Sequence, residues 1–254
     1  MTKRKLFVFG CSYATGEELL AHKLIELDDY RVSTAKDPRK FFKKLEQHNL
    51  TDKWEEIKKE QKLIAWPQLL ADKLALECIN LAESGNSLDK MLYQLYNEIY
   101  NGNVSKNDII LFSLTKATRN ATFNKTVDSF QLPSLHWPVK TLLGVTDSGD
   151  TTSVINKNAD RALLDWFTDE RVLWDYIKNL KALESISFNL YTIPSMKNNF
   201  NTTNDLLERI YDDCSQNFIT QKSLDDFGTE RLAWGHPGKT AHQLYAEHLY
   251  EILR

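Results

Sequence analysis

The sequence predicts an α/β fold in which a mainly parallel central sheet lies between two layers of helices. Short apolar runs alternate along the chain with amphipathic helical segments. The clearest run, DIILFSL at residues 108–114, is almost continuously apolar, as a strand must be when helices cover both faces of its sheet. We therefore expect one three-layer α/β/α domain over residues 1–254, with helical insertions at about 28–62 and 121–180.

Four β-rich runs predict the strands of this sheet: residues 5–9, 78–82, 108–114 and 188–193. Apolar residues at helical spacing predict helices at about residues 66–74, 88–99, 160–183, 205–211 and 240–253. Ser87 can cap the second of these helices, and Gly102 can end it. Thr15 and Glu18 have the spacing of a capping box, so a further helix is expected to start at Thr15.

Composition narrows the class of function. The 32 Lys and Arg against 35 Asp and Glu give a formal charge of −3, so nucleic-acid binding through bulk positive charge is not expected. No run approaches the ~20 apolar residues of a membrane span, and the first residues lack the apolar core of a signal peptide. The three cysteines, an odd number at wide spacing, form neither a metal motif nor a disulfide framework. These features favour a cytoplasmic protein that acts on a small molecule.

Two segments at opposite ends of the sequence combine reactive side chains with a strand end or a helix start. They are residues 10–13 (GCSY) and residues 235–242 (GHPGKTAH). Loops at the carboxyl edge of a parallel sheet converge on one site, so Ser12 and His236 are expected to meet there. A serine hydroxyl becomes a good nucleophile when a base takes its proton, and histidine has the side-chain pKa nearest neutrality. The pair predicts acyl transfer.

Four blocks in order resemble the SGNH hydrolases, also called GDSL-type esterases. They are FGCS at 9–12, NLAESGNS at 80–87, the strand at 108–114, and His236-Pro237 followed by His242 before a final helix. The resemblance implies an SGNH/flavodoxin-like sandwich and a serine ester hydrolase that needs no metal or organic cofactor. It also implies that Ser12 is the nucleophile and His236 the base, with the backbone N–H groups of Ser12 and Gly85 as oxyanion donors.

The substrate expected from this resemblance is a small-molecule ester, such as an O-acetylated carbohydrate. Trp137 and Trp234 are candidates for flat surfaces against a sugar ring, since aromatic faces are common in binding clefts. The sequence does not identify the acyl group of this ester.

The sequence departs from the family pattern at two positions. Ala233 stands where the family has an acid three residues before the histidine. A Ser-His dyad can then form, in which a backbone carbonyl, Asp225, Asp226 or Glu230 holds the ring. The family's Gly-x-Asn-Asp block after the third strand is also missing.

Thr115 or Arg119 could replace the oxyanion donor that this missing block supplies. Because orienting and oxyanion groups matter greatly to rate, a catalytically impaired binding protein with the same fold is the alternative function.

Structural roles remain open for each candidate. Ser12 can serve a turn after the strand, and His236 can be a loop residue beside Pro237 at a helix start. Gly85 can be an ordinary loop glycine. Cys11 is a second candidate nucleophile, although it should point away from Ser12. His242 and His248 lie in the last predicted helix, where packing or surface roles are expected.

Overall fold

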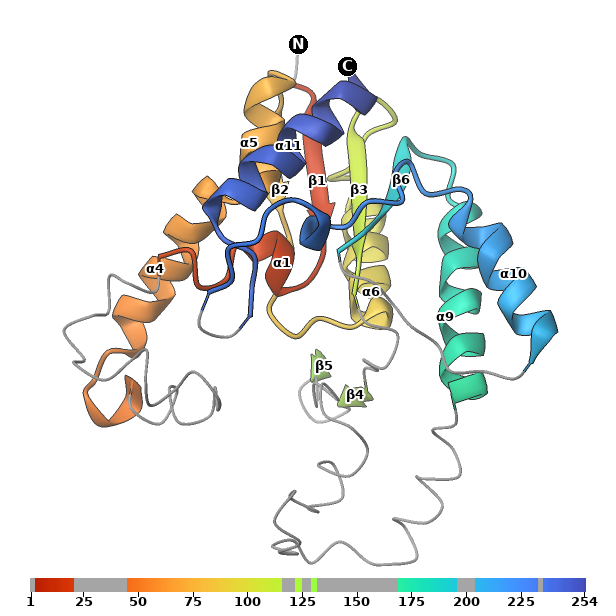
Figure 1. Ribbon diagram of the computed structural model, residues 1–254, viewed down its shortest axis with the longest axis horizontal. Helices are drawn as coiled ribbons and strands as arrows, with labels where there is room; N and C mark the ends of the chain where they lie inside the picture. The colour runs from red at the N-terminus through yellow and green to blue at the C-terminus, as the bar shows by residue number, and fades with distance from the viewer. Residues whose placement is uncertain are drawn as a thin grey trace, which may run out of the picture.

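The structure, a computed structural model, describes residues 3–20, 45–115, 122–124, 129–131, 169–195, 204–232 and 235–254. Its centre is a four-stranded, all-parallel sheet in the order β2-β1-β3-β6 (Figure 1). These strands are β1 (Lys5–Phe9), β2 (Glu77–Asn80), β3 (Ile109–Leu114) and β6 (Leu190–Pro194). Strands β4 (Thr122–Asn124) and β5 (Ser129–Gln131) form a separate antiparallel pair. The predicted α/β class with a parallel sheet is confirmed.

The described helices follow the strands in alternation. They are α1 (Ser12–Thr15), α4 (Thr51–Ile64), α5 (Trp66–Lys73), α6 (Leu88–Tyr100), α9 (Asp169–Glu184), α10 (Asp205–Ser215), the short 3-10 helix η2 (Leu224–Asp226) and α11 (Lys239–Leu253). The predicted helix over residues 160–183 is observed from Asp169 onward, and residues 160–168 lie outside the described part. Within the described residues, no helix combines the length and the apolar character needed to cross a bilayer.

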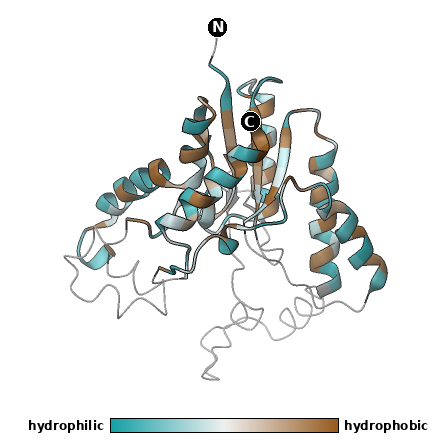
Figure 2. Cartoon of the chain, turned by 45° about the horizontal axis from the view of Figure 1, so that its top comes forward, coloured by the Kyte–Doolittle hydropathy of each residue, from teal (hydrophilic) through white to brown (hydrophobic). Residues whose placement is uncertain are grey.

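Alternation along each strand divides the core between the two faces of the sheet. Phe7 and Phe9 of β1 and Phe112 of β3 pack on one face with α6, α9 and α10. Leu6 and Val8 pack on the other face with α5 and α11. Strands that bury both faces need the continuous apolar runs that the sequence shows, and the helices carry hydrophobic and hydrophilic stripes (Figure 2).

Parts of the two expected insertions form helices with buried apolar side chains. Helix α9 lies at the end of the second one, and its Leu173 and Ile177 are almost fully buried against the sheet. Helix α4 lies in the first one and buries Trp54 and Ile57. Residues 28–44 and most of 121–168 lie outside the described part of the chain.

Two helix signals in the sequence have different outcomes. Ser87 caps α6 as predicted, because its hydroxyl accepts a hydrogen bond from the Lys90 N–H. The capping box predicted at Thr15 is wrong, because α1 ends at Thr15 and the left-handed Gly16 follows it. The Thr15 hydroxyl donates instead to the Ser12 carbonyl at 2.8 Å. Glu17 and Glu18 therefore lie outside the helix, in a buried turn.

His242 joins helix α11 to helix α5 inside the core. Its Nδ1 accepts a hydrogen bond from the Trp66 backbone N–H at 3.1 Å, and 1% of the residue is exposed. Burial, with a smaller effect of His236, lowers the pKa of His242 to about 3. The expected packing role of His242 is therefore observed, since a neutral ring is needed to accept this bond.

Neutral burial of His242 predicts that stability falls in mild acid. The unfolded chain binds a proton near pH 6.5 and the folded chain only near pH 3, so unfolding is favoured as the pH drops below 6.5. Between pH 7 and pH 5 this group should cost about 2 kcal/mol of unfolding free energy. His242→Asn keeps an acceptor for Trp66 without titrating, so urea unfolding should show a smaller pH dependence in the variant. Equal pH dependence in both proteins would contradict this.

Candidate functional site

The site begins at the turn that follows β1. Cys11 is the N-cap of α1, and its carbonyl accepts from the N–H groups of Ala14 and Thr15 at 2.9 and 3.2 Å. Gly10, directly after β1, is closely surrounded: a Cβ there would be 2.8 Å from the Ala14 Cβ and 3.2 Å from the Ser113 Cβ. The absence of a side chain at Gly10 therefore lets α1 fold directly against the sheet and places Ser12 at the carboxyl end of β1 (Figure 1).

Two adjacent carboxylates follow this one-turn helix. Gly16 adopts φ 70°, and the Glu17 N–H then donates to the Ser12 carbonyl at 3.2 Å. Glu18 also has positive φ, at 72°, which is uncommon for a residue with a side chain. Such backbone strain occurs most often at functional sites. The conformation buries both glutamates, with residue exposures of 8% for Glu17 and 3% for Glu18.

A second loop, between η2 and α11, presents His236. Its backbone closes on itself: Leu232 N–H donates to the His236 carbonyl at 2.8 Å, and Gly238 N–H donates to the Glu230 carbonyl at 3.2 Å. Gly235 has φ 87°, a conformation that favours glycine just before the histidine. The loop brings His236 over the α1 turn, where the Tyr13 ring packs edge-on against the imidazole with centroids 5.5 Å apart.

The His236 ring lies between the two glutamates. Its Nδ1 is 2.8 Å from Glu18 Oε2, a hydrogen bond to a carboxylate whose side chain is 1% exposed. Its Nε2 is 3.7 Å from Glu17 Oε2, which is beyond hydrogen-bond distance. An ionised carboxylate only accepts, so the Glu18 contact assigns the proton of the neutral ring to Nδ1 and leaves the Nε2 lone pair available.

The carboxylate beside His236 thus differs from the three that the sequence suggested. Asp225 is engaged by Tyr13, whose hydroxyl donates at 3.4 Å, and by Arg231 at 3.2 Å. Asp226 accepts from Ser223 in a capping box. The Glu230 carboxylate packs against Gly238. Asp225, Asp226 and Glu230 were expected from their closeness in sequence, and Glu18 was missed because its contact spans 218 residues.

Burial also affects the neighbours of this pair. It raises the pKa of the Asp225 carboxyl, opposed by the nearby Arg231 guanidinium. Burial likewise raises the pKa of the Tyr13 hydroxyl, with a further contribution from the charge of Asp225. Tyr13 therefore stays protonated and acts as a donor near the imidazole, not as a base.

Ser12 lies in the same turn as these groups, but its hydroxyl makes no hydrogen bond to His236 among the described residues. The residue is 5% exposed. Its neighbour Tyr13 touches the imidazole, so the hydroxyl and the ring belong to the same small region. Hydrogen bonds of this kind are often long in unliganded sites and shorten when substrate binds.

The loop after β2 approaches the same turn. Glu83 N–H and Asn86 Nδ2 both donate to the Gly10 carbonyl, at 3.1 and 3.2 Å. Between them Gly85 has φ 75°, so a glycine is favoured there for conformational reasons as well as for any close approach of substrate. Asn86 was not anticipated from the sequence, although its carboxamide fixes this loop to the Ser12 turn.

The remaining predicted site residues are placed as follows. Thr115 is fully buried at the carboxyl end of β3, and its carbonyl accepts from the Tyr176 hydroxyl at 3.4 Å. Arg119, Trp137, Ala233 and Trp234 lie outside the described residues. Cys11 is fully buried. Over the described ranges, no cluster of His, Cys, Asp and Glu side chains has the geometry of a metal site.

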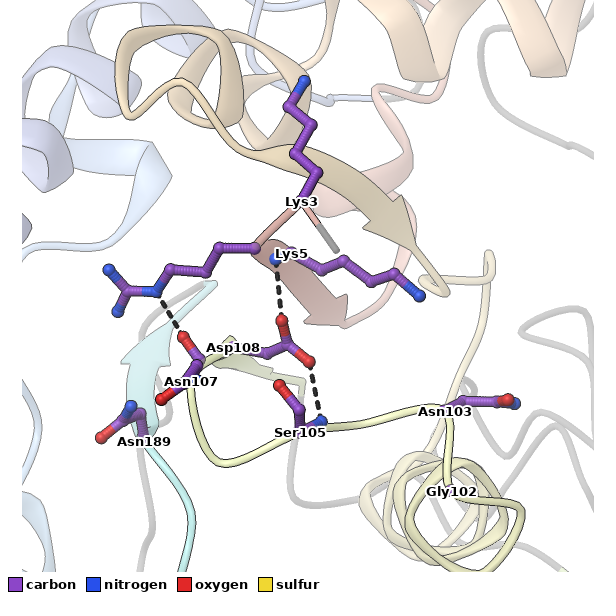
Figure 3. Close-up of a pocket in the computed structure, with 9 residues that line it drawn as sticks. Lys3, Lys5, Gly102, Asn103, Ser105, Asn107, Asp108 and Asn189 are labelled. Carbon is purple, nitrogen blue, oxygen red and sulfur yellow. Dashed lines mark hydrogen bonds between the residues drawn. The ribbon is translucent and has the colours of Figure 1, made fainter. Parts of the chain in front are cut away.

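A cavity of about 560 Å³ opens at the opposite edge of the sheet, where the strands begin. Figure 3 shows it between the start of β1 and the loops before β3 and β6, where the Lys5 N–H donates to Asp108 Oδ1 at 2.8 Å. Ligand sites of parallel sheets form at the carboxyl ends of strands, and this cavity is at the amino ends. The candidate site is therefore the Ser12–Glu18–His236 region.

Comparisons with known proteins find similarity to solved structures. No protein-family model and no curated protein matches the chain. Among solved structures, the chain is similar to a protein from Desulfitobacterium hafniense DCB-2 assigned to the lipolytic G-D-S-L family. That match covers 98% of this chain and 99% of the other, with a TM-score of 0.44 and 9% identity. At this identity and TM-score the match does not assign an activity.

The contact at Gly10 gives a stability prediction for the turn that carries Ser12. Gly10→Ala should lower the free energy of unfolding by about 1–3 kcal/mol, because the added methyl overlaps the Ala14 Cβ. Ala14→Gly removes that overlap, so the double variant should be more stable than the sum of the single effects. Urea unfolding of the four proteins measures the coupling, and strict additivity would contradict this account.

Proposed function

We propose that the chain is a serine ester hydrolase with Ser12 as nucleophile, His236 as general base, and Glu18 as the acid that orients the imidazole. The carrying observation is the 2.8 Å contact between His236 Nδ1 and the buried Glu18 carboxylate, beside the turn that contains Ser12. Glu18, from the amino-terminal part of the chain, would replace the acid that is missing at position 233, where Ala233 stands. The block order FGCS, NLAESGNS and His-Pro implies the same roles for Ser12 and His236 by resemblance, but does not include Glu18.

In the proposed reaction, Ser12 Oγ attacks the ester carbonyl carbon while its proton passes to His236 Nε2. The imidazolium formed lies between the carboxylates of Glu18 and Glu17, at 2.8 and 3.7 Å, which stabilise its charge. The backbone N–H groups of Ser12 and Gly85 would donate to the oxyanion. Collapse of the tetrahedral intermediate releases the alcohol, which takes the proton from Nε2, and water then hydrolyses the acyl-serine by the same route.

The second candidate is a binding protein that retains the fold without turnover. It is favoured by one observation: within the described residues, Ser12 and His236 are not hydrogen-bonded. In this reading the buried Glu18–His236 pair is structural. Breaking a buried ion pair of this kind is destabilising.

A serine-directed probe separates the two candidates. A fluorophosphonate should label the wild-type protein at Ser12, and the protein should hydrolyse p-nitrophenyl acetate. Ser12→Ala should abolish both, with the labelled residue located by mass spectrometry. A folded wild-type protein that neither reacts nor hydrolyses esters would leave only the binding function.

The role of Glu18 has a separate test. Glu18→Gln retains the side-chain shape but no longer stabilises the imidazolium, so kcat should fall by up to about 10⁴-fold with little change in KM. Glu230→Gln is a matched control, because it makes the same change in the His236 loop without contacting the ring. Comparable losses in both variants would show that Glu18 does not act through His236.

A further inference from the structure

A groove of about 340 Å³ adjoins the candidate site on the side of helix α4. Thr15 and Glu17, from the turn after Ser12, form one wall of this groove. Ala82, Glu83 and Ser84, which precede Gly85, form another. The groove and the candidate site also share a hydrogen bond, since the Ser84 hydroxyl donates to Glu17 Oε2 at 2.5 Å. A substrate that reaches Ser12 and Gly85 can therefore extend into the groove.

Every carboxylate that lines the groove has a partner. Glu55 pairs with Lys58 at 2.5 Å along α4. Glu83 uses both oxygens, one for Lys90 and the other for Gln94, whose Nε2 donates at 2.6 Å. Glu17 accepts from Ser84 and faces the His236 ring. Glu55 and Glu83 are thus each paired with a lysine, and Glu17 has the Ser84 hydroxyl as its donor.

Two lysines of the lining are different. In the described part of the chain, neither Lys59 nor Lys62 has a carboxylate within salt-bridge distance. Lys62 Nζ donates to the carbonyls of Asn80 and Ala82, at 3.1 and 2.9 Å, where the chain leaves β2. An ammonium has three donors, so one N–H of Lys62 remains for a ligand. The two carbonyls fix the position of the charge without neutralising it.

Partial burial of this ammonium has an energetic consequence. Loss of water around Lys62 lowers its pKa, opposed by the more distant charge of Glu83. A half-buried cation that lacks a counterion gains more from an anion than an exposed lysine does, because the surrounding dielectric is lower.

We propose that this groove binds an anionic group of the ester substrate through Lys62, with Lys59 contributing at the rim. The inference rests on the proposed esterase function and specifies its substrate class: an ester that carries a carboxylate or phosphate a few bonds from the scissile carbonyl. The charge-assisted hydrogen bond to Lys62 would orient the ester over Ser12.

Paired esters test this specificity. The probes are p-nitrophenyl hemisuccinate, with the carboxylate on the acyl side, and 4-acetoxybenzoate, with it on the alcohol side. Their methyl esters are the neutral controls. Lys62→Met should lower kcat/KM for at least one anionic probe by about 10- to 100-fold and change the neutral esters less than 2-fold. Equal losses for charged and neutral esters, or no loss, would overturn the proposal.

Further variants separate charge from structure. Lys62→Arg should retain most of the preference for the anionic probe, because it keeps the charge. The Lys59 side chain makes no hydrogen bond to a backbone carbonyl among the described residues. Lys59→Met should therefore reduce the preference for the anionic probe by a smaller factor than Lys62→Met does. Lys178→Met, on α9 and away from the groove, is the matched control and should change nothing. A Lys178→Met effect equal to that of Lys62→Met would indicate only long-range charge.

Binding to an inactive variant distinguishes failure of this inference from failure of the proposed function. Titration calorimetry of Ser12→Ala with 4-acetoxybenzoate and hemisuccinate should show binding that Lys62→Met weakens about 10-fold or more. If the wild type hydrolyses esters but Lys62 affects no binding, the groove proposal fails and the esterase stands. If Lys62-dependent binding is found without hydrolysis of any probe, the esterase fails and the anion site stands.

Discussion

The contact between His236 and Glu18 is the interaction on which the candidate site depends. It joins residues 218 positions apart and places a buried carboxylate 2.8 Å from the imidazole. The contact can form because parallel strands end at one edge of the sheet, so the turn after β1 and the loop before α11 meet there. Removal of either partner would take this hydrogen bond out of a largely buried site.

Tight packing at the end of β1 gives the site its position. The chain turns from strand to helix within two residues because Gly10 lets Ala14 and Ser113 come close. The loop after β2 is fastened to the same turn through Gly10, by Glu83 and Asn86. Strain in the Glu18 backbone is then maintained by rigid surroundings, as is usual where a side chain must point in one direction. Ser12, His236 and Glu18 are therefore all positioned relative to one sheet edge.

Charge distribution around this edge is uneven in a way that fits an anionic ester. The carboxylates near the site are each engaged, either with the imidazole or with cations and amides of neighbouring helices. The Lys62 ammonium instead rests on two neutral carbonyls. In the proposed substrate complex, an anion would be the counterion of this ammonium.

The sequence by itself determined the strands, most of the helices and the parallel sheet, because continuous apolar runs and helical periodicity depend on residues close together in the chain. It also predicted that Ser12 and His236 meet at one edge of the sheet, and the family resemblance added Gly85. Tertiary structure alone decided the partner of His236. Glu17 and Glu18 look like part of a capping box, but α1 ends before them and Gly16 turns them inward. Which carboxylate contacts a histidine depends on how loops distant in the sequence pack together, and local sequence patterns do not predict that packing.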